Sequence, residues 1–134
     1  ELTVELWRKH VESSASKGEF HPECDMLILD GIPRNTHQVE MMSEAIDVRA
    51  VLHLACSDMS KMEERIQRRA LKENRMDDGN LDIIRQRFET YTQETQPVLD
   101  CYSNEIVHDI DSTNSPSKVL RDVLSVIVKL ELAS

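Results

Sequence analysis

Glycine is scarce in this sequence, with three residues in 134, Gly18, Gly31 and Gly79. A glycine-rich phosphate cradle of the form G-x-x-x-x-G-K-[ST] needs consecutive backbone amides, a lysine and a helix N-terminus. No stretch of the sequence matches this pattern. The sequence therefore lacks that way of holding the phosphates of a nucleotide.

Long apolar runs and paired cysteines are also missing. No apolar stretch approaches the ~20 residues that a membrane-spanning helix needs, and no signal-peptide pattern opens the chain. The three cysteines, Cys24, Cys56 and Cys101, are scattered, which argues against a disulfide framework or a cysteine-based metal site. We expect each to be a small buried hydrophobic residue, in a cytoplasmic protein with no membrane partner.

Positive charge is in deficit overall but locally concentrated. The net charge of -9 argues against nucleic acid as a partner. Between Lys61 and Arg87, however, eight basic residues outnumber six acidic ones. An arginine-rich segment in an acidic protein suits a small anion better than a polyanion.

Apolar runs and helical patterns alternate along the chain. Three short runs predict buried strands, at residues 25–30 (DMLILD), 50–56 (AVLHLAC) and 105–110 (EIVHDI). Apolar periodicity predicts helices at residues 2–14 and 36–45, and after caps at Ser57–Asp58, Asn80 and Ser115. Pro97 lies inside the helical pattern that follows Asn80, so a kink or break is expected there. The alternation predicts one α/β domain with a parallel sheet, whose ligands lie beyond the carboxyl ends of the strands.

The segment ILDGIPRNTHQ (28–38) stands at one of those strand ends. Asp30 is placed to hold a magnesium ion through water, and Gly31 permits a sharp turn. Arg34 is presented at a helix entrance, where it suits a bidentate phosphate contact. The amide of Gln38, one turn on, suits a base edge. Each residue alone is explained as well by a turn, cap or surface role, and only the combination points to phosphate chemistry.

A second group of arginines lies in ERIQRRALKENRMDD and the helix after it. Arg65 and Arg69 are four apart and share a helix face, and Arg75 and Arg87 follow. Arginines from two helices and the loop between them suit the charge of a transferring phosphoryl group. The plainer interpretation is a solvated helix with pairs such as Glu64–Arg68. We expect that plainer role for Lys61, Arg68, Lys72 and Arg85.

These motifs together resemble those of adenylate kinases, in the nucleoside monophosphate kinase family. LILDGIPRNTHQ resembles the strand-ending Asp-Gly-aromatic-Pro-Arg with its later Gln, and ERIQRR…NRMDD resembles the Arg-x-x-x-Arg helix and the Arg-x-Asp-Asp of the lid. RQRFETYTQETQPVLDCY and ELTVELW resemble two further helices. The resemblance covers nearly the whole chain in order. It implies a three-layer, P-loop-kinase-like parallel sheet flanked by helices, and the reaction ATP + AMP ⇌ 2 ADP with Mg²⁺.

The resemblance also implies residue roles. Arg34 and Gln38 would bind AMP through its phosphate and adenine, and Asp30 would orient the Mg²⁺ shell through water. The implied catalytic arginines are Arg65 and Arg69, which would bind ATP, and Arg75 and Arg87, which would also bind AMP. Asp77 and Asp78 would act in closure of a short lid at about residues 70–79, without a zinc-binding insertion. The loop DSTNSPS would pass near the ATP adenine.

The sequence departs from the family pattern in three places. Ile32 replaces an aromatic residue, and one extra residue lies between Asp78 and Arg87. The third departure is the missing phosphate cradle, together with the monophosphate-binding segment that follows it. We therefore expect residues 1–134 to be a single domain equivalent to the C-terminal two thirds of an adenylate kinase. Without the first strand the sheet would have a central slot with unpaired amides, so we expect little or no kinase activity from this chain alone.

Two other functions remain open at this point. One is a kinase for UMP or CMP, although Gln38 favours adenine, because the pyrimidine-preferring relatives carry Asn at that place. The other is a non-catalytic nucleotide-binding remnant that kept the fold and lost the phosphate cradle. The implied partners are ATP, AMP and ADP, bound by a monomer.

Overall fold

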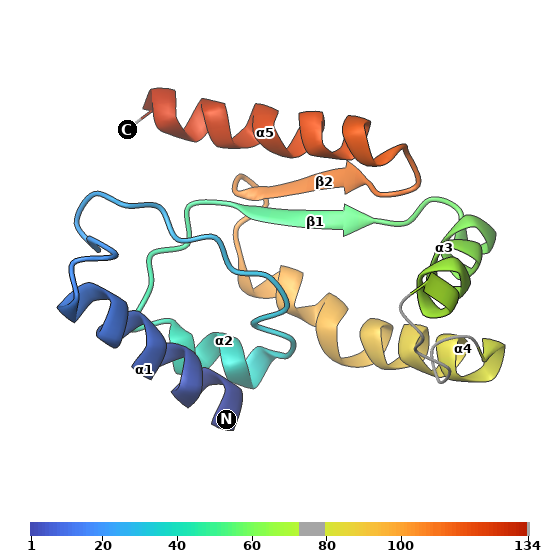
Figure 1. Ribbon diagram of the computed structural model, residues 1–134, viewed down its shortest axis with the longest axis horizontal. Helices are drawn as coiled ribbons and strands as arrows, with labels where there is room; N and C mark the ends of the chain where they lie inside the picture. The colour runs from blue at the N-terminus through green and yellow to red at the C-terminus, as the bar shows by residue number, and fades with distance from the viewer. Residues whose placement is uncertain (73–79, 134) are drawn as a thin grey trace. The chain divides into compact units, whose positions relative to one another are not determined.

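The computed structural model describes residues 1–72 and 80–133 (Figure 1). Backbone contacts divide the chain into two compact units, Glu1–Asp47 and Val48–Ser134. Among the described residues, no helix combines the length and the apolar character needed to cross a membrane.

The first unit contains two helices, α1 (Leu2–Ser16) and α2 (Thr36–Met42). Both predicted helices are therefore present, although α2 ends three residues early. The side chains of Val4 and Met42 are each 1% exposed, and the Arg8 Nη2 group donates a hydrogen bond to the Met41 carbonyl at 3.0 Å. These contacts fix α1 against α2.

The strand predicted at residues 25–30 is wrong, because this segment forms no strand. Met26, Leu27 and Ile28 are 47%, 40% and 69% exposed. A strand is stable only when its backbone groups pair with a neighbour. The described part of the first unit contains no strand that could be that neighbour. An apolar run shows that a segment is suited to burial in a sheet, but it carries no information on whether the partner is present.

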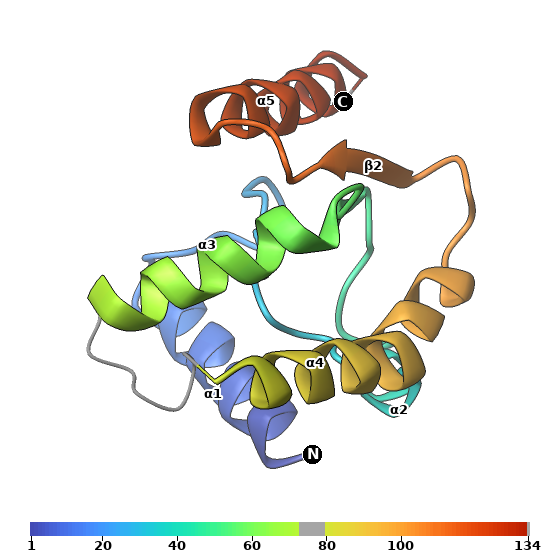
Figure 2. The same cartoon turned by 90° about the vertical axis from the view of Figure 1, so that its right-hand side faces the viewer.

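The second unit is built on two parallel strands, β1 (Val51–Ala55) and β2 (Val107–Asp111). Their register runs from Val51 opposite Val107 to Ala55 opposite Asp111. Helix α5 (Pro116–Ala133) lies on one side of the strands and α4 (Leu81–Thr90) on the other (Figure 1, Figure 2). The predicted class, α/β with parallel strands flanked by helices, is confirmed.

The helix after Asn80 changes its form near Pro97, as predicted. The Asn80 side chain accepts the Asp82 N–H at 2.9 Å and caps α4. A π-helical turn, η2 (Tyr91–Thr95), and a 3-10 helix, η3 (Gln96–Cys101), then replace the α-helix. Proline has no N–H to donate, and its ring clashes with the carbonyl four residues earlier, so the α pattern cannot continue through it.

The buried core of the second unit is small and lies between its helices and strands. Ile84 is fully buried, and Ala70, Val98 and Ile110 are 3%, 6% and 4% exposed. The burial predicted for the cysteines is wrong for two of them, because Cys24 and Cys101 are exposed while Cys56 is half-buried. Cys24 lies in a turn and Cys101 at the end of η3, where fewer neighbours surround a side chain than within a sheet.

Candidate functional site

The turn before α2 folds the Arg34 side chain back onto its own backbone. Gly31 has φ +77°, a left-handed conformation that favours glycine, and the Ile32–Pro33 peptide is cis. The Arg34 Nε group donates to the Gly31 carbonyl at 2.7 Å. A Cβ on Gly31 would lie 3.1 Å from Arg34 Nη2. Glycine is therefore favoured twice here, by the backbone angle and by the guanidinium packed against it.

A reciprocal cap joins Arg34 to Gln38. The Asn35 side chain accepts the Gln38 N–H at 2.9 Å and caps α2. The Gln38 Oε1 atom accepts the Arg34 N–H at 2.7 Å, in an arrangement close to a capping box. Since only the amide oxygen can accept this hydrogen, the orientation of the Gln38 amide is defined. The exposed Asp30 carboxylate precedes this turn in sequence.

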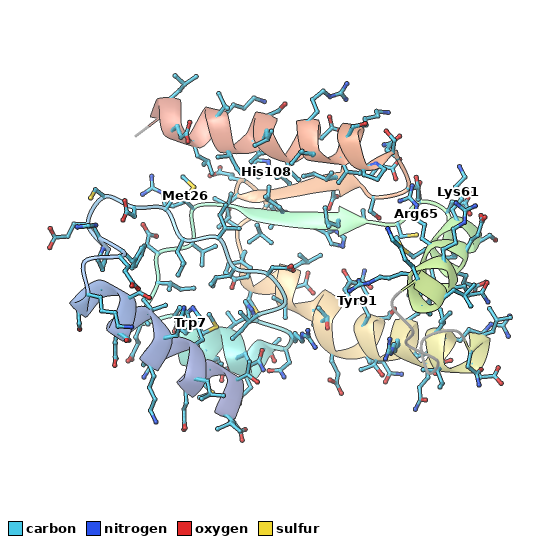
Figure 3. The ribbon with its side chains drawn as sticks, viewed as in Figure 1. Trp7, Met26, Lys61, Arg65, Tyr91 and His108 are labelled. Carbon is cyan, nitrogen blue, oxygen red and sulfur yellow. The ribbon has the colours of Figure 1, made fainter. Side chains whose placement is uncertain are left out.

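In the second unit, Arg65 binds the loop that follows β2. From α3 (Met59–Lys72) its Nη1 group donates to the Ser112 carbonyl, and its Nη2 group donates to the carbonyls of Thr113 and Asn114 at 2.7 and 2.6 Å. The guanidinium is half-buried and lies at the end of the strands where β1 leads into α3 (Figure 3). Arg65 thus joins α3 to the loop expected to pass near the ATP adenine.

Hydrogen bonds at the carboxyl ends of both strands hold this loop in place. The Ser112 N–H and O–H donate to the Ala55 carbonyl at 2.8 and 2.7 Å. The Asp111 carboxylate accepts the Thr113 N–H at 2.9 Å and the Ser57 hydroxyl at 3.2 Å. The side-chain hydrogen bond from Thr113 is the largest cause that lowers the pKa of Asp111, followed by the backbone hydrogen bond from the same residue. A charged Asp111 is therefore part of the loop's structure.

An apolar cavity of about 500 Å³, widely open to solvent, lies beside this loop. Its polar lining comes from Arg65, Ser112 and Asn114. The remaining lining residues are apolar side chains of β1, α3 and the start of α5, namely Leu54, Met62, Pro116, Val119, Leu120 and Val123. An apolar cavity with a few convergent polar groups is typical of a site for a small organic ligand.

The other predicted arginines are distributed over two helices. Arg69 on α3 and Arg87 on α4 have exposed side chains. Arg68 pairs with Glu64 at 2.5 Å, as expected, and Arg85 reaches Glu63 at 3.9 Å. Such exposed pairs contribute at most about 1 kcal/mol. Three further predicted residues, Arg75, Asp77 and Asp78, lie outside the described residues, as does most of the predicted lid.

His53 on β1 is half-buried, and both of its ring nitrogens have hydrogen-bond partners. Its Nδ1 atom lies 2.6 Å from Asp109 Oδ1 and its Nε2 atom lies 2.9 Å from the Tyr91 hydroxyl oxygen. Neither partner was predicted, because the strand register that sets His53 beside Asp109 is not local in sequence. The Asp111–Thr113 cluster was also missed, although Asp-Ser-Thr is a typical turn-forming sequence that could have indicated it.

The described residues contain no group of three or more His, Cys, Asp or Glu side chains that could hold a metal ion. A magnesium ion that enters with a nucleotide needs only one or two carboxylates, because it keeps several waters and the phosphates as ligands. A single exposed carboxylate such as Asp30 fits that manner of binding.

Comparison with known proteins gives two kinds of relative. No protein-family model matches the chain. It is 28% identical over 134 residues to the UMP-CMP kinase of Danio rerio, covering 96% of this chain and 66% of that protein. It is 37% identical over 98 residues to the adenylate kinase of Rhodopirellula baltica, covering 69% of this chain and 50% of that protein.

A second adenylate kinase, from Leptospira biflexa, is 32% identical over 107 residues, covering 75% of this chain and 56% of that protein. The chain spans between 43% and 66% of the length of the curated relatives it matches. Both kinds of relative are nucleoside monophosphate kinases by name.

Proposed function

We propose, because the chain is related by sequence to the nucleoside monophosphate kinase family, that its protein transfers a phosphoryl group reversibly between ATP and a nucleoside monophosphate. The preferred acceptor in this proposal is AMP, which gives ATP + AMP ⇌ 2 ADP. The observation that carries the proposal is Arg65, hydrogen-bonded to three loop carbonyls beside an apolar cavity at the carboxyl ends of parallel strands. Ligands of parallel sheets bind at this end.

The ATP side is proposed at this cavity. Both hydrogens of Arg65 Nη2 are directed at the carbonyls of Thr113 and Asn114, so this edge of the guanidinium is occupied by hydrogen bonds to the loop. Its flat face remains suited to packing on a base. Contacts to the ATP phosphates are proposed to come from Arg69, one turn along α3, because a guanidinium matches phosphate geometry.

The acceptor side is proposed at the turn before α2. Arg34 would bind the phosphate of the monophosphate, since a guanidinium matches phosphate geometry with two parallel hydrogen bonds. Gln38 would contact the base. Arg75 and Arg87 are proposed to stabilise the charge of the transferring phosphoryl group.

Asp30 is proposed to orient, through water, the Mg²⁺ ion that neutralises phosphate charge when the nucleotide is bound. Its exposed carboxylate supports this role without requiring a protein-built metal cage. The chain's own contribution to catalysis is positioning and electrostatics. The arginines hold the reacting oxygens in line and stabilise the charge that spreads over the equatorial oxygens, and no covalent intermediate on the protein is involved.

A UMP-CMP kinase is the second candidate, and the match to the UMP-CMP kinase of Danio rerio over 134 residues favours it. The Gln38 oxygen accepts the Arg34 N–H, but an amide oxygen has a second lone pair, so the amide keeps one acceptor and its donors for a base. Adenine and cytosine each present a ring-nitrogen acceptor beside an amino donor. The amide of Gln38 therefore does not distinguish these two bases by hydrogen bonding alone.

The test uses the full-length protein with Mg-ATP and four acceptors, AMP, CMP, UMP and GMP, with products separated by chromatography. The expected result is ADP formation from AMP with the highest kcat/KM. A higher kcat/KM for CMP or UMP than for AMP would show that the protein acts as a UMP-CMP kinase. Monophosphate binding in calorimetry without any product would overturn the kinase proposal and support a non-catalytic nucleotide-binding protein.

A further inference from the structure

A chain of three side chains connects the two strands to the end of α4. His53 on β1 lies opposite Asp109 on β2 in the parallel register, and its Nδ1 atom is 2.6 Å from Asp109 Oδ1. On the other side of the ring, Nε2 is 2.9 Å from the Tyr91 hydroxyl oxygen. The His53 side chain is 19% exposed. The contacts span 56 and 38 residues of sequence, so they report tertiary structure and not a local turn.

The chemistry of the partners fixes the direction of these hydrogen bonds. A carboxylate can only accept, so Nδ1 of His53 carries the hydrogen and donates to Asp109. In a neutral ring Nε2 is then the acceptor, and the Tyr91 hydroxyl donates to it. Burial, and secondly the charge of Asp109, raise the pKa of Tyr91, which keeps the phenol protonated as a donor.

Tyr91 stands where the α-helix ends and the π-helical turn begins. Arg87 precedes it by four residues on α4, and residues four apart lie on the same face of a helix. In Figure 3, Tyr91 lies between the strands and the helical segment that carries it, whereas His108 lies on the side of α5. The sheet therefore holds α4 at the turn immediately after Arg87.

We propose that His53, oriented by Asp109, is a positioning residue that acts through the Tyr91 hydroxyl to hold Arg87 in the geometry needed for phosphoryl transfer. This inference rests on the proposed function, in which Arg87 contacts the transferring phosphate. The Arg-x-x-x-Tyr spacing alone cannot fix the helix end, because nothing in it anchors the tyrosine. His53 and Asp109 supply that anchor from the sheet.

The test compares steady-state kinetics and thermal unfolding of the full-length protein and its variants. His53→Leu and Tyr91→Phe are each expected to lower kcat between about 10-fold and 100-fold, with a smaller change in KM, because a displacement of about 1 Å at a reacting group costs on that order. His53→Gln, whose amide oxygen can replace Nε2 as acceptor, is expected to restore part of kcat. His108→Leu, on the other face of the sheet, is the matched control and should leave kcat within about twofold.

The decisive comparison repeats His53→Leu in an Arg87→Ala background. If His53 acts through Arg87, the loss of kcat caused by His53→Leu should shrink to less than about twofold there, since coupled residues are not additive. Its loss of thermal stability should persist in both backgrounds. An equal loss of kcat with and without Arg87 would overturn the inference and assign His53 a purely structural role.

Failure of this inference and failure of the proposed function give different results. If the wild-type protein transfers phosphoryl groups but His53→Leu lowers kcat equally with and without Arg87, only the inference is overturned. A wild-type protein that forms no nucleoside diphosphate overturns the proposed function, and the positioning role is overturned with it.

Discussion

The turn around Arg34 and the loop after β2 are both proposed to contact a nucleotide, but they are held in different ways. The hydrogen bonds that shape the turn span three or four residues, from Gly31 to Arg34 and from Arg34 to Gln38. The loop is held by partners 47 to 57 residues away, on α3 and at the end of β1. The turn is therefore a local structure, whereas the loop exists only when the second unit is folded.

The largest expected effect comes from a substitution that removes the contacts holding the loop. Arg65→Ala removes a charged donor from three carbonyls and should lower the free energy of unfolding by about 3 kcal/mol, because hydrogen bonds to charged groups are worth about 1.5–3 kcal/mol each and water replaces part of that loss. Chemical denaturation measures it. Arg68→Ala, on the same helix and paired only at the surface, should cost less than about 0.5 kcal/mol. Equal costs for the two variants would show that Arg65 does not hold the loop.

Next in size is a substitution that breaks the turn. Gly31→Ala places a Cβ at φ +77° and 3.1 Å from Arg34 Nη2, and we expect a loss of about 2 kcal/mol in unfolding free energy. Gly18→Ala is the matched control, with φ +71° and nothing within 4 Å of the new Cβ. It should cost only about 1 kcal/mol. The difference between the two variants isolates the contact with Arg34, and equal losses would show that this contact contributes nothing to stability.

A smaller loss of stability is expected from removing the cap that shapes the turn, and it tests whether the turn is held by local contacts. Asn35→Ala removes the cap on the Gln38 N–H and should cost about 1 kcal/mol. A double-mutant cycle with Gln38→Ala should give a coupling of about 0.5 kcal/mol or more, since the two side chains form one reciprocal cap. The same cycle between Asn35→Ala and Ser112→Ala is the control. Additivity in the first cycle would contradict the reciprocal cap.

The smallest expected effect is the pH dependence of the loop. The folded-state pKa of Asp111 is lowered, chiefly by its hydrogen bond from Thr113. The charged Asp111 carboxylate therefore stabilises the folded state above its unfolded-state pKa of about 4. This stabilisation is lost as the pH falls through the lower folded-state pKa. Asp111→Asn should show a flatter decline in denaturation midpoint between about pH 5 and pH 2 than the wild type. Parallel declines would contradict the role given to the charged carboxylate.

Features that depend on local sequence were predictable. The caps at Asn35 and Asn80, the helix start at Pro116 and the break near Pro97 each rest on the chemistry of one residue and its close neighbours. The hydrogen bond from the Arg34 N–H to Gln38 Oε1 is equally local, spanning four residues. A base contact, and not this cap, was nevertheless predicted for Gln38 from the sequence.

Features that depend on distant partners were not predictable. The apolar run at residues 25–30 has no strand, because strand formation requires a partner that the run itself does not specify. Likewise, nothing in the sequence of β1 shows that His53 lies opposite Asp109, or that Arg65 binds the carbonyls of a loop almost fifty residues later. The roles predicted for the site residues, Arg75, Asp77 and Asp78 among them, and the single domain remain predictions.

Two-substrate kinetics of the full-length protein test the proposed phosphoryl transfer most directly, with ATP and AMP varied against each other. We expect ADP formation, with Arg34→Ala raising mainly the KM for the monophosphate and Arg65→Ala raising mainly the KM for ATP. A protein that forms no diphosphate from AMP, CMP or UMP, or in which Arg34→Ala weakens only ATP and Arg65→Ala only the monophosphate, would contradict the proposal.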